Sequence, residues 1–187
     1  MSAVPQSPQN FVPDPWVSRF GPLVNPGGHV LDLASGAGRH ARYFLDRGHP
    51  VTALDRSVSL LDPLKGRQGL EIVEADIESG SWPLEGRHFD GIVVVNYLHR
   101  PLLPILNRSL NPGGVLIYRT FGIGNEGYGK PSNPNFLLRP NELLETLKDL
   151  EVIAFESGDT GIAVVQRICA VKRDIRRSDD APYPLPI

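Results

Sequence analysis

The sequence predicts an α/β fold in which a mostly parallel sheet, covered by helices on both faces, ends in an antiparallel hairpin. Short β-prone runs alternate with helical stretches, and the runs are almost entirely apolar, as in strands buried on both faces. Near the end of the chain only the turn "GDTG" separates two such runs, so this pair must be antiparallel. A chain of 187 residues is most simply one domain with a sizeable core.

The chain begins with "MSAVPQSPQN", and we expect residues 1–13 to be loose. "DPWVSRFGPLV" predicts a short helix with Asp14 as its N-cap and Pro15 at its first position. Trp16 and Phe20 are spaced i and i+4, which is typical of a core stripe, although Trp16 is also a candidate substrate contact.

Seven strands and four further helical stretches are expected after this helix. The strands are placed at 29–33, 50–54, 70–75, 89–95, 114–120, 151–157 and 162–173. The helical stretches are placed at 37–48, 57–64, 101–110 and 139–150. We assign 14–173 to one domain and 174–187 to a tail that is disordered or forms a surface strap.

Composition excludes several classes of protein. The formal net charge of −2 provides no global attraction to nucleic acid or anionic membrane. The one cysteine, Cys169, excludes an internal disulfide and a multi-cysteine metal site, and its apolar surroundings indicate a buried, reduced thiol. The start has no signal-peptide pattern and no apolar run reaches membrane-spanning length, so a cytoplasmic location is expected. No metal-ligand spacing is present.

The stretch "VLDLASGAGRH" carries the main functional signal. Gly36, Gly38 and Ala41 fit the spacing G-x-G-x-x-G/A of a nucleotide-binding turn after a strand. Asp32 ends that strand and is expected to point into the crevice at the carboxyl ends of the strands. A carboxylate there would repel a pyrophosphate but attract the ammonium and sulfonium groups of S-adenosylmethionine. The pattern therefore favours S-adenosylmethionine over a dinucleotide.

Two more carboxylates follow the next two strands. Asp55 can accept hydrogen bonds from both ribose hydroxyls, and Asp76 suits the adenine amino group, with Ile77 packed on the ring. Purely structural alternatives remain for each carboxylate. Asp32 would then cap the next helix, Asp55 would be a turn residue at a strand end, and Asp76 would form an Asx turn.

The motifs "VLDLASGAGRH", "TALD", "EADIE", "FDGIVVVNYLHR" and "LNPGGVLIYRTF" together resemble those of the class I S-adenosylmethionine-dependent methyltransferases. The resemblance runs from about Val30 to Thr120. "SNPNFLLRPNELLE" makes the chain more similar to the small tellurite-resistance-type methyltransferases. The resemblance implies a Rossmann-like, doubly wound seven-stranded sheet in the order 3-2-1-4-5-7-6, with strand 7 antiparallel.

The resemblance also implies which residues bind the cofactor. The implied set is Asp32, Ala34, Gly36, Gly38, Asp55, Arg56, Asp76, Ile77 and Asn96. Asn96 and Tyr97 follow the fourth strand, where the methyl donor faces the acceptor. Ser35 stands where relatives often have cysteine. Arg119 stands where a neutral or acidic residue is expected near the acceptor, which leaves the charge of the substrate open.

Methyl transfer from an activated sulfonium mainly requires positioning of the two reactants. A hydroxyl or amine acceptor also needs a base, for which His99, Tyr97 and His40 are the candidates, whereas a thiolate or soft chalcogen needs none. His40 is otherwise a solvated polar residue, and His99 otherwise caps the helix that begins at Pro101. "NYLH" replaces the "NPPY"-like motif of amino-group methylation, and no Pro-Cys pair is present.

The segment from Phe121 to Phe136 is glycine-rich and long, and we expect it to be a substrate lid rather than a plain connector. Candidate substrate contacts are Trp16, Arg100, Asn125 and Tyr128, with Phe136 as a seal. The expected function is methyl transfer to a small molecule by a chain that binds no membrane and is not expected to bind nucleic acid. Alternatives are an RNA methyltransferase, a non-catalytic cofactor-binding module and a nicotinamide-dependent oxidoreductase. The oligomeric state is left open.

Overall fold

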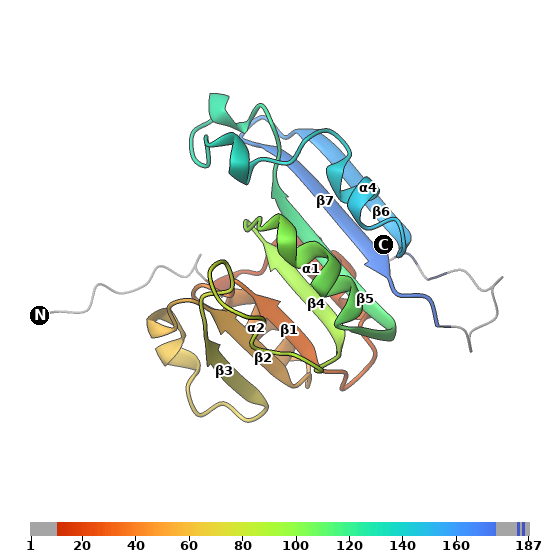
Figure 1. Cartoon of the computed structure of the whole chain (residues 1–187). Coiled ribbons are helices and arrows are strands. Elements are labelled where there is room, and N and C mark those ends of the chain that lie inside the picture. Colours follow the sequence, from red (N-terminus) through yellow and green to blue (C-terminus); the bar gives the residue numbers. More distant parts are fainter. Residues whose placement is uncertain (1–10, 175–182, 184, 186–187) are drawn as a thin grey trace, which may run out of the picture.

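The structure is a computed structural model that describes residues 11–174, 183 and 185. The expectations for residues 1–10 and for most of the tail lie outside the described residues. The centre is a seven-stranded sheet in the order β3-β2-β1-β4-β5-β7-β6, which Figure 1 shows running from β3 at lower left to β6 at upper right. The strands are β1 (Val30–Leu33), β2 (Val51–Asp55), β3 (Leu70–Glu74), β4 (Phe89–Val95), β5 (Leu110–Phe121), β6 (Glu151–Asp159) and β7 (Val164–Val171).

The strand pairing confirms the expected topology. The five strands β3, β2, β1, β4 and β5 are parallel to one another. β7 is antiparallel to both β5 and β6. Five strands differ in length from their predictions, and β5 differs most. β5 begins at Leu110 rather than residue 114, because Leu110 pairs with Phe89 across an irregularity in the register before Gly91.

The helices are shorter than the stretches that predicted them. They are α1 (Pro15–Phe20), α2 (Arg39–Leu45), α3 (Leu103–Arg108) and α4 (Glu142–Thr146), with 3₁₀ turns η2 (Gly21–Leu23), η3 (Ser59–Leu64), η4 (Arg100–Leu102), η5 (Asn125–Gly127) and η6 (Pro134–Phe136). The stretch 57–64 is a 3₁₀ turn rather than an α-helix. Pro63 lies inside it, and proline removes a donor and clashes with the preceding turn of an α-helix.

Two apolar clusters cover the two faces of the sheet, as the alternation of side chains along a strand requires. Val30 belongs to the cluster that includes α1 and α2, and Leu31 belongs to the cluster that includes α3 and α4. Trp16 and Phe20 are buried with ring centroids 4.5 Å apart, so they form the expected core stripe. Burial raises the pKa of the Cys169 thiol to about 12.

The first helix begins as predicted, because Asp14 Oδ1 accepts the backbone N–H of Trp16 at 2.9 Å. Across the part of the chain that the structure describes, none of the helices combines the length and apolar character that crossing a bilayer requires.

Candidate active site

The turn after β1 uses backbone conformations that favour glycine. Ala34, Gly36 and Gly38 have φ angles of +54°, +53° and +72°. A Cβ atom at Gly36 would meet nothing within 4 Å, whereas one at Gly38 would lie 2.6 Å from methyl carbons of Leu61 and Leu64. Gly36 therefore leaves space for a ligand, and Gly38 is required by packing against η3, a reason that sequence reasoning missed.

Asp32 caps helix α2. Its side chain is 2% exposed, Oδ2 accepts the backbone N–H of Ala41 at 2.9 Å, and Oδ1 lies 3.7 Å from Nδ1 of His40. This geometry corresponds to the alternative in which Asp32 caps the helix. Side chains alternate between the two faces of a strand, so Asp32 lies on the same face as Val30, which packs on the α2 side of the sheet. A role for Asp32 in cofactor binding stays a prediction.

His40 lies in the first turn of α2 and is buried, so the alternative that it is solvated is wrong. Its Nε2 lies 3.3 Å from the backbone nitrogen of Asp14, which donates to it. His40 therefore links the segment before α1 to Asp32, and its use as a catalytic base stays a prediction.

A cavity of about 350 Å³ lies at the carboxyl ends of β2 and β3. Its lining residues are Ala34, Asp55, Arg56, Asp76, Ile77, Glu78, Tyr97 and Phe136. Most of the predicted adenosine-binding residues therefore lie together around one space, with Tyr97 from the end of β4. Of these lining residues, sequence reasoning missed Glu78, which its position two residues after Asp76 could have indicated.

Asp55 and Asp76, two of the three carboxylates in the lining of this cavity, already accept hydrogen bonds. Asp55 Oδ2 accepts the N–H of Gly36 at 2.8 Å, and Oδ1 accepts that of Ser57 at 3.1 Å. Asp76 forms an Asx turn by accepting from Ser79 Oγ at 2.7 Å and from the N–H of Glu78 at 2.9 Å. These hydrogen bonds lower the pKa of Asp76, and the bond from Ser79 has the largest effect. The carboxylate of Asp76 therefore stays ionised at neutral pH and can accept hydrogen bonds.

A second cavity of about 180 Å³ adjoins the first. It is lined by Glu78, Asn96, Tyr97, Leu98, Thr120, Phe121, Pro131 and Phe136. Tyr97 lies in both walls, and its hydroxyl is buried. Burial and then the charge of Glu78 raise the pKa of Tyr97 well above its usual value. The phenol therefore stays protonated, which argues against its prediction as a base.

Arg119 places a largely buried cation beside the end of β4. Its guanidinium donates to Oδ1 of Asn96, and its Nε lies 3.8 Å from Oδ2 of Asp14. Desolvation lowers the pKa of Arg119, Asp14 opposes this, and the nearby Arg167 and Arg39 lower the pKa further. Of the three charged side chains that shift the pKa of Arg119, two are arginines and one is an aspartate.

Three other predicted site residues do not line the two cavities. His99 precedes η4 without a capping hydrogen bond, and it is not among the residues that line the two cavities, while Trp16 lies in the core. Asn125 is 1% exposed and binds backbone groups of Pro131 and Val164, at 3.1 Å and 3.3 Å.

Tyr128 and Arg100 also have structural partners. The Tyr128 hydroxyl donates to Asp159 at 2.7 Å, and Arg100 binds Glu142 and two backbone carbonyls. Their assignment as substrate contacts stays a prediction that this geometry does not favour. The expected lid is therefore anchored to β6 and β7, and Phe136, which we predicted to be a seal, lines both cavities.

Comparisons with known proteins agree with this fold. A family model described as "Methyltransferase domain" matches residues 30–114. The malonyl-[acyl-carrier protein] O-methyltransferase of Enterobacter lignolyticus is 37% identical over 97 residues, which are 49% of this chain and 38% of that protein. The first curated relatives are thus matched over less than half of their own length.

Two solved structures show the same fold. TehB from Haemophilus influenzae has a TM-score of 0.68 at 21% identity, over 84% of this chain and 61% of that one. The glycopeptide N-methyltransferase MtfA, in complex with S-adenosyl-L-homocysteine, has a TM-score of 0.58 at 22% identity, over 83% and 88%. With the strand order, these matches show that the chain has the fold of the class I S-adenosylmethionine-dependent methyltransferases and that residues 30–114 are similar to their methyltransferase domain.

Proposed function

We propose that this chain binds S-adenosylmethionine and transfers its methyl group to a small-molecule acceptor. The observation that carries the proposal is the single cavity lined by Asp55, Asp76, Ile77 and Tyr97 at the ends of neighbouring strands. The carboxylates there offer acceptors to ribose hydroxyls and to an adenine amino group, and Ile77 and Tyr97 offer apolar surface to the ring. A cavity of about 350 Å³ is within the range of ordinary cofactor sites.

The cofactor would supply an already electrophilic methyl group, so the chain's task is mainly to orient and to exclude water. Asp55 and the Gly36 backbone fix the position of the turn, because they are joined by a 2.8 Å hydrogen bond. Tyr97, as a neutral phenol in both walls, would donate a hydrogen bond rather than remove a proton. This arrangement suits an acceptor that arrives already deprotonated.

We further propose that the acceptor carries an anionic group next to the atom that is methylated. Support comes from Arg119, a desolvated cation beside Asn96, because such a guanidinium binds carboxylates strongly. A relative named as a malonyl-[acyl-carrier protein] O-methyltransferase is consistent with a carboxyl-bearing acceptor.

Calorimetric titration with S-adenosylhomocysteine tests cofactor binding, and titration with NAD tests the nicotinamide alternative. We expect binding of the first and none of the second. Asp55→Asn should weaken S-adenosylhomocysteine binding roughly 10-fold by removing one charged acceptor. The exposed Asp149→Asn variant is the control. Equal affinity in the Asp55 variant, or binding of NAD alone, would contradict the proposal.

Turnover with radiolabelled S-adenosylmethionine, assayed against a panel of carboxylic acids and their primary amides, tests the acceptor class. Acids but not amides should be labelled, and Arg119→Met should abolish labelling while the exposed Arg108→Met variant retains it. Labelling of amides alone would contradict an anionic acceptor. Binding without any turnover would favour a non-catalytic module, and steeply salt-dependent RNA binding would favour an RNA methyltransferase.

A further inference from the structure

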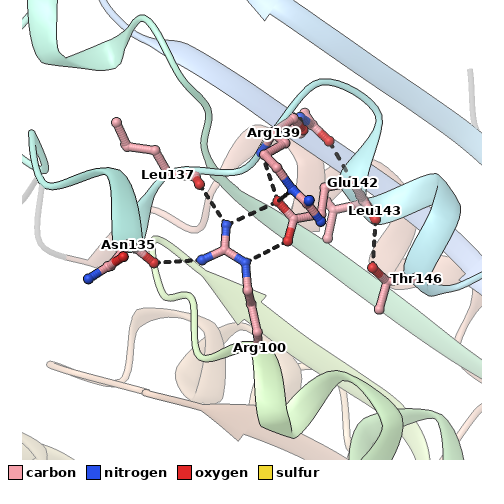
Figure 2. Close-up of polar contacts among 8 residues, drawn as sticks. Arg100, Asn135, Leu137, Arg139, Glu142, Leu143 and Thr146 are labelled. Atoms are coloured by element: carbon pink, nitrogen blue, oxygen red, sulfur yellow. Dashed lines mark hydrogen bonds and ion pairs between the residues drawn. The ribbon is translucent and has the colours of Figure 1, made fainter.

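Arg100 ties the loop before α4 to the end of β4 (Figure 2). Its Nη1 donates to the carbonyl oxygen of Asn135 at 2.7 Å, and its Nη2 donates to that of Leu137 at 2.8 Å. The same guanidinium forms a two-pronged pair with Glu142, in which Nε–Oε1 is 2.6 Å and Nη2–Oε2 is 3.0 Å. Arg100 thus joins residues 35 to 42 positions away in the sequence.

Glu142 makes this contact rigid. Its side chain is only 3% exposed, and its Oε2 also accepts the backbone N–H of Arg139 at 2.7 Å. Burial alone would raise the pKa of Glu142, but the hydrogen bonds from Arg100 and from that N–H outweigh burial and lower it. The carboxylate therefore stays charged at neutral pH, and removing Arg100 would leave a buried charge without its main partner.

The two carbonyls that Arg100 holds flank Phe136. Phe136 lies in η6, a 3₁₀ turn of three residues. The residue is 45% exposed, yet it lines both cavities together with Tyr97. Such a short 3₁₀ turn has little stability of its own. The position of the ring therefore depends on how its flanking backbone is held.

We infer that Arg100 is a positioning residue for the cofactor site, acting through Phe136. Its guanidinium, fixed by Glu142, holds the backbone on both sides of Phe136 so that the ring closes the wall shared by the two cavities. The inference rests on the proposed function for the identity of the ligand, and it gives Arg100 a role other than the predicted contact with substrate.

A double-mutant cycle between Arg100→Gln and Phe136→Ala tests this inference, with S-adenosylhomocysteine affinity measured by calorimetry. Phe136→Ala should weaken binding about 5- to 10-fold through lost apolar contact, and Arg100→Gln by a similar factor. The double variant should bind no more weakly than Phe136→Ala alone. Arg139→Gln is the matched control, because its guanidinium is 69% exposed and its Nε lies 3.5 Å from Glu142 Oε2; we expect less than about a 2-fold change.

Amide exchange gives a second readout. Arg100→Gln should speed exchange at Phe136 and Leu137, whose N–H groups donate to Asn133 and Pro134, and Arg100→Lys should restore part of the protection and of the affinity. Multiplying losses in the double variant, or unchanged affinity and exchange in Arg100→Gln, would overturn the inference. If Arg100→Gln does not fold, Arg100→Lys takes its place in the cycle. A wild-type chain that fails to bind S-adenosylhomocysteine would instead contradict the proposed function.

Discussion

Two glycines in the turn after β1 should respond in opposite order to the same substitution. A methyl group at Gly38 would lie 2.6 Å from Leu61 and Leu64, both fully buried, at a φ of +72°. The left-handed conformation costs about 1–2 kcal/mol for alanine, and overpacking costs about 1–3 kcal/mol. We therefore expect Gly38→Ala to lower the free energy of unfolding by about 2–5 kcal/mol.

Compared with Gly38→Ala, Gly36→Ala should lower the free energy of unfolding less and weaken binding of S-adenosylhomocysteine more. Its Cβ would meet nothing within 4 Å, so only the conformational cost of about 1–2 kcal/mol applies. The added methyl group would occupy space beside Asp55 that we assign to the cofactor. Urea unfolding ranks the two variants by stability, and calorimetry with S-adenosylhomocysteine ranks them by affinity. The same ranking in both assays would refute this reasoning.

Three further predictions concern single residues. Burial, and then the charge of Arg87, lower the pKa of His29 from its usual 6.5. The contribution of His29 to stability is therefore complete above pH 6.5 and is lost as the pH falls. In urea unfolding, His29→Asn should make the free energy of unfolding less dependent on pH, whereas the exposed His88→Gln variant should not. Ala34→Gly should raise the free energy of unfolding in urea by up to about 1 kcal/mol by relieving a φ of +54°. In the same assay without ligand, Asp55→Asn should lower the free energy of unfolding by about 1–2 kcal/mol, because Asp55 accepts the N–H of Gly36. An unchanged free energy of unfolding would mean that this hydrogen bond does not stabilise the fold.

The positions of the strands were predictable because most of the β-prone runs are largely apolar. β4 has the predicted bounds, 89–95, and the resemblance supplied the sheet order that the structure confirms. The early start of β5 was not predictable, because the pairing of Leu110 with Phe89 crosses an irregular register that leaves no periodic signal. The 3₁₀ turn at 59–64 could have been anticipated from Pro63.

The end of the site that we propose for the cofactor was more predictable than the end that we propose for the acceptor. Asp55 and Asp76 follow parallel strands, whose carboxyl ends must lie along one edge of the sheet. The path of the loop from 122 to 141 depends instead on partners far along the chain. Tyr128 binds Asp159, 31 residues away, and Arg100 binds Glu142, 42 residues away. Composition and spacing carry no record of such pairings.

The position of β7 has a consequence for synthesis of the chain. β5 carries Arg119 and Thr120, and its outer edge is paired only when Val164–Val171 has been made, about 45 residues later. Until then the apolar run from Val115 to Tyr118 presents an open strand edge, which favours association between nascent chains. The acceptor side of the site is therefore completed last, and a ribosome-bound chain that ends before β7 should have a greater tendency to aggregate than the finished molecule.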